Sequence, residues 1–106
     1  MAKYLFKASL SADGVAGVRA EGGTARRAVV KSAIESLGGS LESFYFAFGD
    51  DDVLVICDLP DNETAAAFAL ETSASGRGSV STSVLITPEE MDRARDKKSG
   101  WRAPGT

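Results

Sequence analysis

Histidine is absent from this chain of 106 residues, and cysteine occurs once, at Cys57. These two facts exclude Ser-His-Asp and Cys-His catalytic triads and zinc sites of the cysteine/histidine type. A single cysteine also excludes a disulfide within the chain. Any catalysis would therefore have to depend on carboxylate, tyrosine or arginine side chains.

Long apolar runs are also missing, since none approaches the roughly 20 residues that a membrane-spanning helix requires. Lys3 and Lys7 lie near the start without an apolar stretch or a cleavage pattern, so no signal peptide is predicted. The net charge of −3 and the isoelectric point near 4.9 argue against a nucleic-acid-binding surface. We therefore expect a cytoplasmic protein that requires no cofactor and binds neither membranes nor nucleic acids.

Four segments have the residue patterns of β-strands. Three of them, residues 3–10, 41–48 and 80–86, show the two-residue alternation of a strand, and the first two are rich in aromatic side chains. Residues 53–57 instead form a continuous apolar run, which favours burial on both faces. The turn sequence Gly49-Asp50-Asp51 predicts a hairpin between the second and third strands. The predicted strands cover residues 3–10, 41–48, 53–57 and 80–86.

Two longer segments have the spacing of amphipathic helices. The first carries an apolar stripe, and we expect it to begin at an N-cap on Thr24 and to end at Gly38-Gly39. The second follows the stop signal Pro60-Asp61. Shorter helices are predicted at residues 15–21 and from the capping box Thr87-Pro88-Glu89-Glu90 to about Lys98. The two stripes are Val30, Ala33, Ile34 and Leu37, and Ala65, Phe68, Ala69 and Thr72.

The order β-α-β-β-α-β, followed by a short helix, predicts an α+β fold of the ferredoxin-like type. Right-handed crossovers place both main helices on one face of a four-stranded antiparallel sheet. We predict one such domain over residues 1–98 and a C-terminal tail over residues 99–106. Trp101 in this tail either docks on a partner subunit or belongs to a disordered end.

The second face of the sheet is predicted to be bare and apolar. Phe44, Phe46 and Phe48 share the face of the second strand that we expect to meet the helices. The third strand is apolar on both faces, with Val53, Val55 and Cys57 on one and Leu54 and Ile56 on the other. A soluble monomer rarely exposes a patch of several hundred Å². We therefore predict a homodimer in which two sheets pack face to face as an α/β barrel, with higher oligomers as an alternative. The second strand would add Leu41, Tyr45 and Ala47 to this bare face, with Ser43 between them.

Several local motifs together resemble the GYD-domain family of small bacterial proteins, over about Ala2 to Asp96. The resemblance implies the dimeric α/β-barrel fold and no established activity. Of the name-giving Gly-x-Tyr-Asp, Gly49 and Asp52 match, whereas Asp51 stands where the family usually has tyrosine. The motifs are Glu21-Gly22-Gly23 before Arg26-Arg27, Ser36-Leu37-Gly38-Gly39-Ser40-Leu41-Glu42-Ser43-Phe44-Tyr45-Phe46, Phe48-Gly49-Asp50-Asp51-Asp52-Val53, and Thr87-Pro88-Glu89-Glu90-Met91.

The candidate ligand-binding residues are Arg26, Arg27, Tyr45 and Asp52. The two arginines open a helix after a glycine pair, an arrangement suited to a carboxylate or phosphate; the alternatives are a solvated helix start and an ion pair with Glu21. Tyr45 would donate its hydroxyl to a ligand in a barrel cavity, or else belong to the core.

Carboxylates supply the remaining candidates. Asp50, Asp51 and Asp52 lack the spacing of a cation-binding loop, so we predict no metal site and a solvated turn in which Asp52 bonds turn amides. Asp52, Tyr45 and Glu42 are the candidate catalytic residues, and a carboxylate would serve as acid or base only if burial raised its pKa toward neutrality. We expect the Cys57 thiol to be buried and unreactive, with a pKa above its usual value.

Three functions are compatible with these patterns. The first is a homodimeric binding or accessory protein with a small-molecule ligand between helices and sheet. The second is a cofactor-independent monooxygenase or an isomerase acting on a small ring compound. The third is a purely structural subunit of an oligomer.

Overall fold

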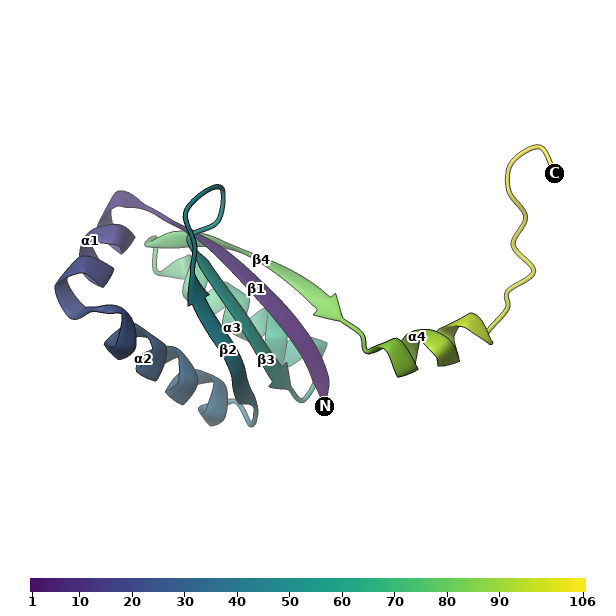
Figure 1. Cartoon of the computed structure of the whole chain (residues 1–106), viewed down its shortest axis with the longest axis horizontal. Helices are drawn as coiled ribbons and strands as arrows, with labels where there is room; N and C mark the ends of the chain where they lie inside the picture. The colour runs from purple at the N-terminus through teal and green to yellow at the C-terminus, as the bar shows by residue number, and fades with distance from the viewer.

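Four antiparallel strands form one sheet in the spatial order β2-β3-β1-β4 in the computed structural model, which describes residues 1–106 (Figure 1). The two outer strands each follow a helical crossover, which confirms the predicted ferredoxin-like α+β fold. The elements are β1 (Ala2–Leu10), α1 (Ala12–Glu21), α2 (Gly23–Ser36), β2 (Ser40–Phe46), β3 (Val53–Leu59), α3 (Asn62–Ala74), β4 (Gly78–Leu85) and α4 (Pro88–Arg95).

One face of the sheet carries α1, α2 and α3 and holds the core. In β3, every second residue is buried against the helices, and the residues between are partly exposed. Ile34 of α2 is fully buried, and Phe68 of α3 packs edge-on against Phe6 of β1 with ring centroids 5.0 Å apart. Both predicted helical stripes therefore face the core. The buried apolar residues are Tyr4, Phe6, Ile34, Val53, Val55, Cys57, Leu59, Ala65 and Phe68.

A β-bulge in β2 overturns part of the predicted face assignment. Leu41 lies opposite Cys57, and Ser43 lies opposite Ile56. Glu42 therefore has no partner of its own in β3 and is an extra residue in β2. An extra residue shifts the alternation by one position. Leu41 is therefore on the covered face, packed against the core, and not on the bare face with Tyr45.

The strand also ends earlier than predicted. β2 stops at Phe46, and Phe48 lies in the connecting loop with its side chain fully exposed. Phe44 and Phe46 do face the helices, with ring centroids 5.2 Å apart. A Cβ on Gly23 would lie 3.0 Å from the Phe46 ring, so the start of α2 rests on this phenylalanine.

The predicted N-cap at Thr24 is wrong. Gly22 adopts φ = 89° between α1 and α2, a conformation that glycine adopts readily, so α2 begins directly afterwards at Gly23. Thr24 is then inside the first turn. The first helix also begins earlier than predicted, because the Ser11 side chain accepts a hydrogen bond from the Gly14 amide and caps it.

The second face of the sheet carries no helix. Leu5 of β1 lies opposite Ile56 of β3. Leu54 of β3 lies between Lys7 of β1 and Tyr45 of β2. Serines occupy most of this face of β4. We call the apolar group at its centre the open-face patch; it consists of Leu5, Tyr45, Leu54, Ile56 and Leu85.

α4 and the residues after it form an arm that projects away from the sheet (Figure 1). Every residue from Pro88 to Thr106 is exposed, and the molecule is 57 Å long but only 32 and 22 Å in its other dimensions. The predicted capping box is confirmed, and the helix ends at Arg95, three residues before Lys98. None of the four helices is long and apolar enough to cross a membrane.

Candidate functional site

A cavity of about 260 Å³ lies between the sheet and the helices that cover it. All four strands and all three covering helices contribute to its wall, and 10 of its 15 lining residues are hydrophobic. The sheet contributes Phe6 and Phe44 to the wall, and the helices contribute Val18, Val30 and Phe68. The apolar wall is typical of a site for a small organic molecule, and the volume is slightly smaller than the roughly 300 Å³ at which such sites usually begin.

Arg26 is one of two cationic side chains that line this cavity. It belongs to the first turns of α2, and its Nη1 lies 3.4 Å from a carboxylate oxygen of Glu21. Its Nε is buried and has no hydrogen-bond partner. Leaving a buried donor unpaired costs about 1–3 kcal/mol, and more for a charged group. The unpaired N–H is enclosed by protein atoms, so an acceptor can reach it only if the side chain shifts.

Arg77 is the second cation of the cavity wall. The turn before β4 holds it in place, because its carbonyl accepts a hydrogen bond of 2.9 Å from the Ser11 amide. A Cβ on Gly14 would lie 2.1 Å from that carbonyl oxygen, so only glycine permits this approach of α1. The guanidinium lies along α1, with Nη1 3.7 Å from the Cβ position of Gly17, and it forms no ion pair.

The electrostatic balance of the cavity is positive. No acidic side chain lines it, and Glu21 is the one carboxylate that contacts either arginine. Two guanidinium charges are thus offset by one carboxylate charge. The arrangement leaves about one positive charge, that of the solvent-exposed Arg77, at the edge of an apolar space.

Of the four predicted ligand-binding residues, only Arg26 lines the cavity. Arg27 is exposed on α2, and Tyr45 lies on the opposite face of the sheet, where 66% of it is exposed. The predicted alternative for Arg26, an ion pair with Glu21, is also present. The structure therefore separates these residues between two faces of the sheet.

Asp52 connects the hairpin between β2 and β3 to strand β1 by two hydrogen bonds. One carboxylate oxygen accepts a hydrogen bond of 2.7 Å from the Leu10 amide, and the Asp52 amide donates one of 2.8 Å to the Ala8 carbonyl. The prediction that Asp52 bonds turn amides is therefore wrong, because its partner is the end of β1. Asp51 lies 3.9 Å from the Lys7 ammonium.

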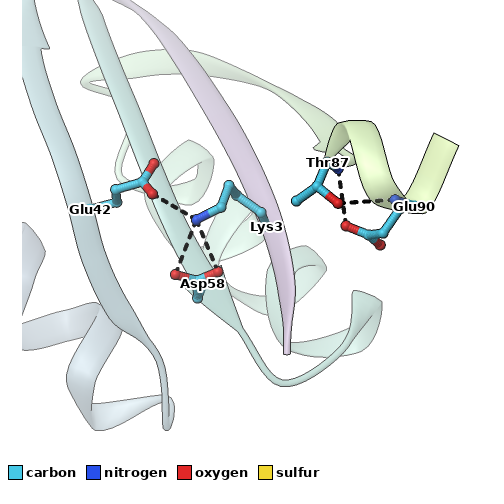
Figure 2. Close-up of polar contacts among 5 residues, drawn as sticks. All are labelled: Lys3, Glu42, Asp58, Thr87 and Glu90. Carbon is cyan, nitrogen blue, oxygen red and sulfur yellow. Dashed lines mark hydrogen bonds and ion pairs between the residues drawn. The ribbon is translucent and has the colours of Figure 1, made fainter. Parts of the chain in front are cut away.

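Glu42 belongs to a charged cluster beside the open-face patch. Lys3 of β1 reaches Glu42 at 2.9 Å and Asp58 at 3.2 Å (Figure 2). The hydrogen bond with Glu42 raises the pKa of Lys3 above its usual value of 10.5. The bulge that displaces Leu41 also brings the Glu42 carboxylate to this ammonium. Figure 2 further shows the capping box, in which the Thr87 hydroxyl accepts from the Glu90 amide at 3.1 Å.

Cys57 is fully buried in the core, as its apolar strand predicted. Burial raises the pKa of its thiol to about 11. At neutral pH the group is therefore protonated, and protonated thiols are poor nucleophiles.

A second, larger hollow of about 450 Å³ runs between α3 and the outer strand β4. Leu70 and Val84 on its rim are 71% and 59% exposed. Tyr4 closes its floor and donates a hydrogen bond of 2.6 Å to the Asn62 side chain. Unlike the cavity, this groove has no charged lining residue that would orient a polar ligand.

The sequence did not single out Arg77, which stands between the helix predicted after Pro60-Asp61 and the strand predicted at residues 80–86. The available signal was the context Gly76-Arg77-Gly78, in which one cation stands between two glycines just before an apolar strand. Glycines on both sides favour a tight turn, and the turn fixes the backbone of Arg77 while its side chain stays exposed. The cavity itself had no signal, because it depends on how three helices pack over the sheet.

The fold and the cavity together define a small α+β protein with a partly open, mostly apolar site between sheet and helices. The family model of the GYD domain matches residues 4–94. The chain therefore belongs to the GYD-domain family, as its local motifs indicated. No curated protein and no solved structure matches the chain.

Proposed function

We propose that the protein is a cytoplasmic homodimer that binds a small molecule in the cavity of each subunit. The observation that supports binding is the apolar cavity between sheet and helices, which two cationic side chains border. The free, buried Cys57 is compatible with a reducing compartment such as the cytoplasm.

The open-face patch supports the dimer. Burial of apolar surface contributes about 25 cal/mol per Å², so each 400 Å² removed from water contributes about 10 kcal/mol before the costs of association. The charged groups around the patch are already paired, Lys3 with Glu42 and Asp58 and Lys7 with Asp51. A second copy can therefore approach this face without leaving a lysine unpaired.

The enzymatic alternative has less support from the geometry. Asp52, Tyr45 and Glu42 were its candidate acids and bases, and none of them lines the cavity. Asp52 is engaged by a backbone amide and Glu42 by an ammonium. A binding role needs none of these groups at the ligand.

A ligand screen by native mass spectrometry and thermal shift tests the proposal. We expect a dimer that retains small apolar molecules and unfolds at a higher temperature in their presence. A Phe68→Trp variant, which fills the cavity from α3, should lose this response, whereas Leu70→Trp on the exposed side of α3 should keep it. Failure of every apolar ligand to bind would remove the binding function.

A further inference from the structure

The position of two arginines at the wall of an apolar cavity identifies the class of ligand. We propose that the cavity binds an apolar monocarboxylate, with its hydrocarbon part among the phenylalanines and its carboxylate at Arg26 and Arg77. This inference rests on the proposed binding function and adds the charge of the ligand to it.

The unpaired donor of Arg26 favours a ligand that carries an acceptor. The Nε of Arg26 is buried without a partner, although one Nη of the same group lies near Glu21. Arginine pairs best with a carboxylate when two of its N–H groups bind the two oxygens side by side. A shift of the Arg26 side chain toward the cavity that it lines would expose this N–H to a ligand carboxylate, which would supply the acceptor that the protein lacks.

The number of charges at the cavity favours a ligand with a single negative charge. Arg26 and Arg77 carry two positive charges and Glu21 carries one negative charge, so the site balances a single negative charge. A carboxylate has that charge at neutral pH. A phosphate monoester carries between one and two negative charges and would leave the site with an excess.

The apolar part of the cavity wall favours a hydrocarbon group on the ligand. Phe6, Phe44 and Phe68 all line the cavity, and no acidic residue does. A hydrocarbon chain or ring is stabilised there by removal from water. A small polar anion such as acetate or inorganic phosphate would leave this wall without a partner.

The test compares octanoate with 1-octanol, which has the same chain length and no charge. Binding to the wild-type protein is followed by NMR, with the Nε–H signals of the arginines as a local readout. We expect octanoate to bind at least about tenfold more tightly than octanol, because charge-assisted hydrogen bonds contribute only to the anion. Octanoate, but not octanol, should shift the Nε–H signal of Arg26.

Variants assign the effect to the cavity. Arg77→Gln and Arg26→Gln should each weaken octanoate binding by about tenfold and leave octanol binding unchanged. Arg27→Gln is the matched control, because Arg27 is the exposed neighbour of Arg26 and does not line the cavity. It should bind octanoate like the wild type.

The outcomes separate the two proposals. Equal affinity for octanoate and octanol, or an equal effect of Arg27→Gln and Arg77→Gln, would overturn the carboxylate assignment and keep the binding function. If neither octanoate nor octanol binds, and no other apolar molecule in the screen binds either, both the carboxylate assignment and the binding function are overturned.

Discussion

The two faces of this sheet are built from the same four strands and differ in how their apolar residues are covered. On the covered face, Phe6 and Val55 lie beneath helices and are almost fully buried. On the other face, Leu5 and Ile56 are paired neighbours in the same two strands and have no helix above them. The covered face is therefore apolar across all four strands, whereas the open face is apolar only at its centre and polar around it.

We therefore expect the covered face to determine the stability of the single chain and the open face to determine its assembly into a dimer. The covered face buries its side chains within one chain and leaves a cavity among them. The open face has an apolar centre and paired charges around it, which is the pattern of a surface that meets another protein. Substitutions on the two faces should therefore have different consequences.

The largest expected effect is loss of the dimer in Ile56→Asp. A carboxylate at the centre of the open-face patch would be buried without a partner at the interface. We expect the dissociation constant to rise by at least about a thousandfold, or roughly 4 kcal/mol, in sedimentation equilibrium. Ala28→Asp, which adds the same charge on the exposed side of α2, should leave the dimer intact. A stable Ile56→Asp dimer would remove the distinction between the faces.

The next effect is on the covered face. Ile34 is fully buried, so Ile34→Ala should lower the free energy of unfolding by about 2–5 kcal/mol through lost burial and a residual cavity. Val29→Ala on the same helix removes a side chain that is 49% exposed and should cost less than about 1 kcal/mol. Urea unfolding measures both. Equal losses would mean that α2 does not seal the core.

A smaller effect is expected for the C-terminal arm. Trp101 is 76% exposed, and the arm has no buried residue in the single chain. If the tail docks on the partner subunit, deletion of residues 99–106 should weaken the dimer by about tenfold, the equivalent of one partly buried aromatic side chain. The same deletion should not change the unfolding of a monomeric Ile56→Asp variant. An unchanged dissociation constant would show that the tail takes no part in assembly.

The smallest effect concerns Lys3 at the edge of the open face. Its pKa is higher in the folded chain than the usual 10.5, so the ammonium contributes stability below pH 10.5 and loses it as the pH rises through the folded value. The unfolding free energies of the wild type and Lys3→Met should differ by less than about 1 kcal/mol at pH 7. That difference should shrink above pH 10.5. A difference that stays constant up to pH 12 would contradict this role of the ion cluster.

Most of the fold could be predicted from the sequence because each signal was local. The stripe that contains Ile34, the capping box at Thr87 and the apolar run after Asp52 depend only on neighbouring residues. The bulge at Glu42 could not be predicted in this way. It inserts one residue against the partner strand, and the resulting change of face is visible only once the pairing is known.

The candidate site was less predictable than the fold. Arg26 was identified from its place at a helix start, but Tyr45 and Asp52 were grouped with it without knowledge of the register. Arg77 lies far from Arg26 in the chain, and the turn before β4 brings it to the same cavity. Such a site depends on tertiary packing, which composition and spacing do not encode.

Native mass spectrometry of the wild-type protein in the presence of octanoate tests the central claim most directly, because it reports stoichiometry and bound ligand together. The predicted result is a species of twice the 11.1 kDa chain mass that carries up to one octanoate per subunit. A monomer without ligand at micromolar concentration would contradict the account of both faces.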